Sequence, residues 1–144
     1  MFIANVLKLI RIKDWLKNII IFLPLVFSEQ FFNTPNYTSL IIAFLLFSIV
    51  SSLIYVVNDI LDINRDSVHP NKKIIKPLAN GNLSLMSAYF ILSILIFMSV
   101  LLVIPQNYLI MHVITYLILS LMYNFFLKKI PYLEFIILAF GYII

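Results

Sequence analysis

The sequence predicts an all-α fold, a polytopic bundle of transmembrane helices, and three observations support this class. The chain of 144 residues is 63% hydrophobic and only 11% charged, which is too little charge to cover a soluble globule of this length. Long runs carry no charged residue. The ten Lys and Arg residues lie in clusters between those runs. Because hydrocarbon leaves an open strand edge unpaired, each apolar run is expected to be a helix.

About five apolar segments are expected to be the membrane spans, since a helix needs about 20 residues to cross hydrocarbon. Their approximate bounds are 15–32, 39–57, 83–104, 108–127 and 131–144. Pro24 lies inside the first segment and is expected to kink it. The fifth segment is still apolar where the sequence stops at Ile144, and it is short for a span. We therefore expect residues 1–144 to be the N-terminal part of one transmembrane domain, a fragment of a longer chain.

The basic residues predict the orientation of the chain. They lie at or before the start of the first span, or between the second and third spans, or between the fourth and fifth. The other two connections, around 33–38 and 105–107, carry none, so all ten Lys and Arg fall on one side of the membrane. The positive-inside rule makes that side cytoplasmic. The sequence thus predicts an integral protein of the cytoplasmic membrane with its N-terminus in the cytoplasm.

Two classes of partner or site are excluded by composition. The net charge of +4 does not indicate nucleic acid, because the basic residues are sorted by membrane side rather than gathered into a groove-sized patch. The chain has no cysteine, which excludes disulfides and thiolate metal sites.

Acidic residues concentrate in NDILDINRD, residues 58–66, directly after the second apolar run. If that helix continues past Val57, a rotation of about 100° per residue sets the four polar side chains on one face. Relative to Asn58 at zero, they lie near ~40° (Asp62), ~80° (Asp66) and ~100° (Asp59). Carboxylates this close repel one another unless a cation lies among them. Mg²⁺ suits such oxygen ligands and prefers one or two carboxylates together with substrate phosphates.

A basic loop follows the acidic stretch. It reads HPNKKIIKPLANG over residues 69–81, and its lysines can neutralise a diphosphate as negative charge builds on a leaving group. Acidic face, basic loop and Gly81 together predict a magnesium–diphosphate site at the cytoplasmic membrane surface. The alternative is a solvated helix end whose acids pair with Arg65, Lys72 and Lys73.

The motif in residues 58–66 resembles NDxxDxxxD, the first aspartate-rich motif of the UbiA superfamily of intramembrane prenyltransferases, and residues 69–81 are similar to the loop that follows it. RIKDWLKNIIIFLPLVFS (11–28) and YNFFLKKIPYLEFIILAFGYII (123–144) resemble one branch, the decaprenyl-phosphate phosphoribosyltransferases and their relatives. The resemblance covers nearly the whole chain but only the first half of the family's usual length. It implies about nine spans when complete and a second aspartate motif that this sequence lacks. Lys76 stands where the family has arginine, one residue further from His69 than expected.

The resemblance implies magnesium-dependent transfer of a phosphoribosyl group from phosphoribosyl diphosphate to a polyprenyl phosphate, with release of diphosphate. It gives metal-binding roles to Asn58, Asp62 and Asp66. It makes Asp62, Asp66 and Asp59 the candidate catalytic residues, with Asp59 expected either to support the metal ligands or to contact the ribose. The substrate-binding candidates are lysines of the loop, two residues at the inner end of the first span and one at the inner end of the fourth: Lys72, Lys73, Lys76, Lys17, Asn18 and Tyr123.

Two other functions are compatible with parts of the sequence. An aromatic prenyltransferase of the same superfamily, as in quinone or haem biosynthesis, also needs a magnesium–diphosphate site, so the acidic motif does not separate the two enzymes. A non-enzymatic membrane protein, such as a transporter subunit or a cation channel, would place ionisable residues at mid-membrane depth. The charges here cluster at one surface instead, which favours the enzyme.

Overall fold

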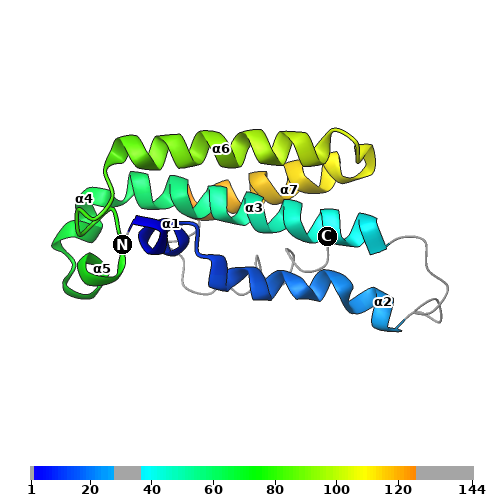
Figure 1. Cartoon of the computed structure of the whole chain (residues 1–144), viewed down its shortest axis with the longest axis horizontal. Coiled ribbons are helices and arrows are strands. Elements are labelled where there is room, and N and C mark those ends of the chain that lie inside the picture. The colour runs from blue at the N-terminus through cyan, green and yellow to red at the C-terminus, as the bar shows by residue number, and fades with distance from the viewer. Residues whose placement is uncertain (1, 28–36, 126–144) are drawn as a thin grey trace. The chain divides into compact units, whose positions relative to one another are not determined.

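The computed structural model describes residues 2–27 and 37–125, with side chains to residue 122. Its elements are α1 (Phe2–Leu9), the 3₁₀-helix η1 (Ile12–Phe22), α2 (Leu23–Phe27), α3 (Tyr37–Leu61), α4 (Ile63–Val68), α5 (Pro70–Ile75), α6 (Leu85–Val103) and α7 (Asn107–Phe125) (Figure 1). The described residues form no strand, which confirms the all-α prediction. The chain divides into two compact units, 1–102 and 103–144, and the candidate site lies in the first.

Helices α3 and α6 are long and apolar enough to cross a membrane. Their most apolar 18-residue windows have mean hydropathies of 2.8 and 2.5, and they coincide with the predicted second and third spans. Of these windows, 44% is buried within the protein in α3 but only 17% in α6. A helix that is apolar all round and little buried by protein is suited to contact with lipid. Among the described residues, α3 is therefore the more buried of the two helices and α6 the more exposed.

The first predicted span differs from expectation. It is not one α-helix kinked at Pro24 but a 3₁₀-helix that becomes α-helical at Leu23, so Pro24 lies in the first turn of α2, where it breaks no helical hydrogen bond. A 3₁₀-helix rises about 2.0 Å per residue and an α-helix about 1.5 Å. Together η1 and α2 extend about 30 Å, close to the hydrocarbon thickness, with fewer residues than an α-helix needs. Residues 28–32 of the predicted span lie outside the described part.

The remaining predicted spans are only partly described. Helix α7 corresponds to the fourth, and its 19 residues equal the length of α6. The fifth, 131–144, lies outside the described residues, as does the side chain of Tyr123.

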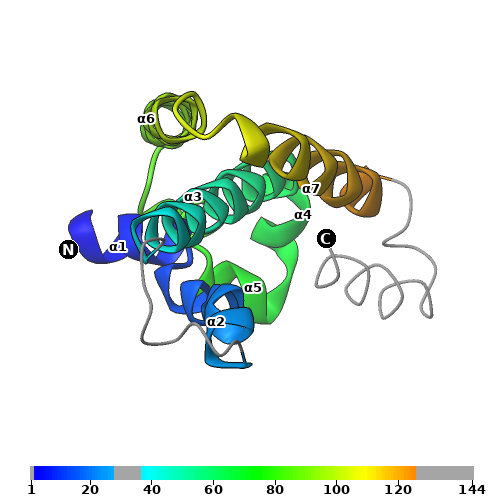
Figure 2. The same cartoon turned by 90° about the vertical axis from the view of Figure 1, so that its right-hand side faces the viewer.

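The polar elements α1, α4 and α5 gather at one end of the first unit, where α3 ends and α6 begins (Figure 1). Helix α1 lies across the direction of α3 (Figure 2). A hydrophobic core closes this end and is made of Leu9, Val56, Leu78, Leu83, Ala88, Ile91 and Leu95. Gly81 has φ +77°, a conformation that L side chains rarely adopt, and it turns the chain from the basic loop into α6. The acidic stretch and the basic loop are thereby held side by side.

Candidate active site

The acidic stretch lies where α3 ends and α4 begins. Asp62 separates the two helices with φ −90° and ψ 3°. Its N–H nevertheless donates to the Asn58 carbonyl at 2.9 Å, and the Asp66 N–H donates to the Asp62 carbonyl at 2.9 Å. These bonds link residues four apart, so the helical register continues through the break. The prediction that the second helix extends beyond Val57 is confirmed.

Asp59 and Asp66 are buried and face the same cation. Their exposed fractions are 3% and 0%. The Lys76 Nζ donates to Asp59 Oδ1 at 2.7 Å and to Asp66 Oδ2 at 2.6 Å. Seven residues are close to two full helical turns, so the two carboxylates lie one above the other and one ammonium group reaches both. The shared face that the helical spacing predicted is confirmed for this pair.

Two further cations flank the pair. Lys72 Nζ lies 3.4 Å from Asp66 Oδ1, and Arg11 Nη2 lies 3.4 Å from Asp59 Oδ1. We call Arg11, Asp59, Asp66, Lys72 and Lys76 the Lys76 cluster. Its two carboxylates and three cations leave a net charge of +1. The cluster is therefore a buried pair of acids inside a positive environment, which is suited to an incoming anion.

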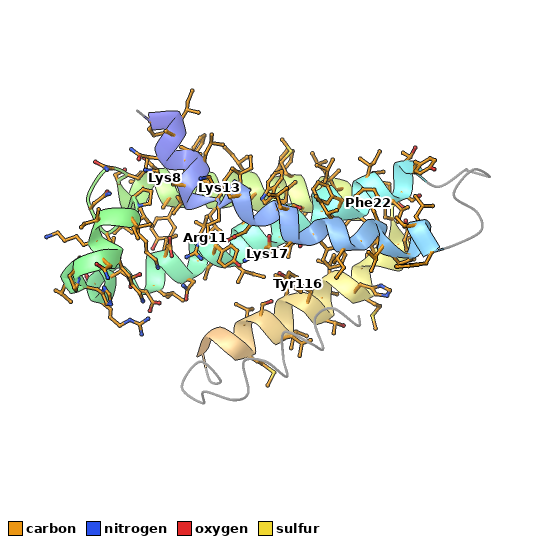
Figure 3. All side chains as sticks on the ribbon, turned by 90° about the horizontal axis from the view of Figure 1, so that it is seen from below. Lys8, Arg11, Lys13, Lys17, Phe22 and Tyr116 are labelled. Carbon is orange, nitrogen blue, oxygen red and sulfur yellow. The ribbon has the colours of Figure 1, made fainter. Side chains whose placement is uncertain are left out.

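Arg11 was counted in the sequence only as a basic residue, but the structure gives it a specific position beside α3 (Figure 3). It is the one described non-glycine residue with positive φ, at 50°. That conformation costs about 1–2 kcal/mol. Its guanidinium lies 4.2 Å from the centre of the Tyr55 ring and also pairs with Asp59. These two contacts offset the backbone cost and fix the N-terminal segment to the acidic end of α3.

Burial raises the pKa of Asp66, but the hydrogen bond and the positive charge of Lys76 outweigh burial, and Lys72 adds to their effect. The net pKa therefore lies below the ordinary value, and Asp66 is ionised at neutral pH. Asp66 Oδ1 has no hydrogen-bond partner among the described residues, although the Lys72 ammonium lies 3.4 Å away. This leaves a charged, buried oxygen with unused acceptor capacity.

The other acidic candidate makes a different contact. Asp62 pairs with Arg65 at 2.9 Å, an i, i+3 bridge in which the arginine side chain is 58% exposed. This bridge agrees with the solvated alternative for that one acid. Asn58 is half-buried one turn before Asp62. The structure thus brings Asp59 and Asp66 together on one cation, and the metal-binding roles of Asn58 and Asp62 stay predictions.

The loop after α4 positions two of its three predicted lysines beside the acids. His69 caps α5, since its Nδ1 accepts from the Lys72 N–H at 3.4 Å, and Pro70 occupies the first turn. Lys72 and Lys76 are four residues apart and reach the same carboxylate, Asp66. Lys73 is exposed. Lys76, which stands where the family has arginine, has the closest contacts with the acids.

A polar ladder joins η1 to α3. Trp15 Nε1 donates to Ser52 Oγ at 2.9 Å, and Asn18 Nδ2 donates to Ser48 Oγ at 3.0 Å. Ser52 Oγ itself donates to the Ile10 carbonyl at 2.7 Å. Side chains three residues apart are eclipsed in a 3₁₀-helix, which sets Trp15 and Asn18 in one row against serines four apart on α3. The ladder is the framework that presents Arg11 to Asp59.

Two predicted substrate residues lie on η1. Asn18 belongs to the ladder, so its amide is engaged with α3. Lys17 pairs with Asp14 at 3.2 Å and its side chain is 60% exposed (Figure 3). Their contacts with substrate stay predictions. The signal for the ladder was present in the sequence as Ser48 and Ser52, two small polar residues one turn apart in an apolar helix.

The residues of the Lys76 cluster fit the predicted magnesium ion when a diphosphate accompanies it. No group of three or more His, Cys, Asp or Glu side chains in the described ranges is arranged to hold a metal ion. A complete protein cage is therefore not formed there. Mg²⁺ commonly takes one or two carboxylates and completes its shell with phosphate and water. Asp59 and Asp66 supply two such carboxylates, and the free acceptor capacity of Asp66 Oδ1 supports this fit.

The model of the UbiA prenyltransferase family matches residues 19–144. A decaprenyl-phosphate phosphoribosyltransferase from Mycobacterium tuberculosis is 30% identical over 99% of this chain and 48% of its own length. The enzyme of the same name from Corynebacterium glutamicum is 35% identical over 67% of this chain and 29% of its own. The chain thus spans less than half the length of these relatives.

Proposed function

Because the chain belongs to the UbiA prenyltransferase family, a family of membrane-embedded transferases, we propose that it forms part of an enzyme that moves a phosphoribosyl group from phosphoribosyl diphosphate to a polyprenyl phosphate. The names of the relatives support this choice of reaction. The observation that carries the proposal is the Lys76 cluster, where two buried carboxylates lie among three cations at the end of a membrane-spanning helix.

In the proposed reaction the bond between C1 of the ribose and the diphosphate oxygen breaks, and diphosphate leaves with the bonding electrons. A phosphate oxygen of the polyprenyl phosphate forms the new bond to C1. Magnesium, when bound, supplies neutralisation of the charge on the leaving group. Asp59 and Asp66 would hold it, with Asn58 and Asp62 as the further ligands that the resemblance implies.

The cations have separate proposed roles. The ammonium groups of Lys72 and Lys76 stand beside the acids, so they neutralise the departing diphosphate from the side of the loop. Lys73 and Lys17 are exposed and are proposed to meet the substrate phosphates from solution and from the lipid interface, respectively. Asn18 and Tyr123 complete the proposed set.

We propose that this end of the bundle faces the cytoplasm, and labelling tests it directly because the chain has no native cysteine. Lys13→Cys lies at the basic end and Thr38→Cys at the opposite end of α3, and both positions are exposed. A membrane-impermeant maleimide is expected to label Thr38→Cys in intact cells and Lys13→Cys only in inverted vesicles. The reverse pattern would place the site outside the cell.

The reaction is tested with the purified protein in lipid nanodiscs. Magnesium, phosphoribosyl diphosphate and a polyprenyl phosphate are expected to give diphosphate and a lipid-linked phosphoribose, measured by mass spectrometry. Omission of the lipid phosphate should abolish the lipid product. Release of diphosphate from a prenyl diphosphate with an aromatic acceptor, and none from phosphoribosyl diphosphate, would assign the aromatic prenyltransferase function instead.

A further inference from the structure

We infer that Lys76 is the resident counter-cation of the acidic site, which a divalent metal displaces only when the metal arrives with a diphosphate. The inference rests on the proposed function and concerns how the site is loaded. The same carboxylates that would hold the metal are already bridged by the Lys76 ammonium, at 2.7 Å from Asp59 and 2.6 Å from Asp66.

The metal and the Lys76 ammonium group compete for the same two carboxylates. Mg²⁺ binds carboxylate oxygens at about 2.0–2.1 Å. A metal at that distance from Asp59 Oδ1 and Asp66 Oδ2 would take the position of the ammonium group. A metal on Asp66 Oδ1, which Lys76 leaves without a hydrogen bond, would still repel the ammonium group. Lys76 must therefore move, and its flexible four-carbon stem permits this without a change in the backbone.

Charge decides what can displace Lys76. The Lys76 cluster already carries a net charge of +1, so a bare divalent ion raises it to +3 in a buried place. A diphosphate ester carries about three negative charges near neutral pH, two on the outer phosphate and one on the inner. Metal and diphosphate together bring about −1, which leaves the loaded site close to neutral. The cluster thus complements the metal–diphosphate pair and disfavours the metal alone.

When the metal and the diphosphate bind, the displaced Lys76 ammonium group gains the phosphate oxygens as its new partners. A diphosphate bound to the metal brings phosphate oxygens to within reach of the loop, and Lys76 exchanges two carboxylates for these oxygens. Lys72 and Arg11 keep their positions on the outer sides of the acids. Metal binding and diphosphate binding are therefore coupled, and each strengthens the other by the same factor.

The test measures binding rather than turnover, by equilibrium dialysis of Mn²⁺ as the probe at pH 7.5. Wild-type protein is expected to bind Mn²⁺ alone weakly. Inorganic diphosphate, present equally in both chambers, should raise the affinity at least tenfold. Lys76→Met removes the ammonium but keeps the apolar stem, so it should bind Mn²⁺ alone at least tenfold more tightly than wild type. The matched control Lys13→Met removes one exposed charge from η1 and should bind as wild type does.

The outcomes separate the two proposals. If wild type binds Mn²⁺ equally well with and without diphosphate, the metal site stands and the role of Lys76 is wrong. If Lys76→Met gains no affinity for Mn²⁺, that role is also wrong. If Mn²⁺ binds under neither condition, the proposed metal site itself fails. The wild-type measurement needs no variant, so a folding defect in Lys76→Met does not remove the test.

Discussion

Asp66→Asn is expected to lower transferase activity by about 10²- to 10³-fold, the range for removal of one preorganised electrostatic contact at a reacting centre. The substitution keeps the shape of the side chain and its ability to accept from Lys76, but removes the charge that would bind the metal. Asp66 is fully buried and is held ionised by its contact with Lys76, and its Oδ1 is an acceptor that no described residue uses for a hydrogen bond. The rate of diphosphate release in nanodiscs measures the effect.

The next residue of α4 supplies a matched control. Ser67 donates only to the carbonyl of Asn64 within its own turn, at 2.9 Å. Ser67→Ala should therefore keep the wild-type rate, and both variants should reach the membrane fraction in equal amounts. An Asp66→Asn protein with more than a third of the wild-type rate would contradict the metal-binding role.

The parts of the fold that the sequence predicted are those set by periodicity and hydropathy. Helices α3 and α6 follow from charge-free runs, because a long apolar stretch has few alternatives in a membrane. The common face of Asp59 and Asp66 follows from helical spacing alone. The 3₁₀ form of η1 was not predictable in this way, since it depends on the ladder that Trp15 and Asn18 make with a helix some 30 residues later.

The candidate site also has one part that the sequence predicts and another part that it does not. Its acids are close together in sequence and can be found there, whereas the cations of the Lys76 cluster come from two other segments, the N-terminal segment and the basic loop. Lys76 reaches the acids because α5 turns back under α4, and Arg11 reaches Asp59 across 48 positions of chain. The sequence motif makes Asn58, Asp62 and Asp66 the expected metal ligands and gives Asp59 a supporting role or a contact with the ribose. The structure buries Asp59 as it buries Asp66 and gives each of them two cations, so Asp59 is also expected to contribute strongly to stability.

Asp59→Ala is expected to destabilise the protein by about 3 kcal/mol, because it breaks a buried ion pair. This value is the lower end of the range for such pairs, since one partner, Arg11, is one third exposed and partly screened by solvent. The loss leaves the Lys76 ammonium, whose side chain is 15% exposed, with one carboxylate instead of two. It also leaves Arg11 in its left-handed conformation without the ion pair that helps to hold it.

Asp62→Ala is the control within the same motif, only three residues away. Its partner Arg65 is 58% exposed, and exposed pairs contribute about 0–1 kcal/mol. Thermal unfolding in detergent with EDTA, which removes any contribution of bound metal, should therefore separate the two variants by at least 2 kcal/mol. Equal destabilisation by the two variants would mean that Asp59 and Asp62 are equally solvated. The Lys76 cluster would then not be the feature that holds α3, the basic loop and the N-terminal segment together.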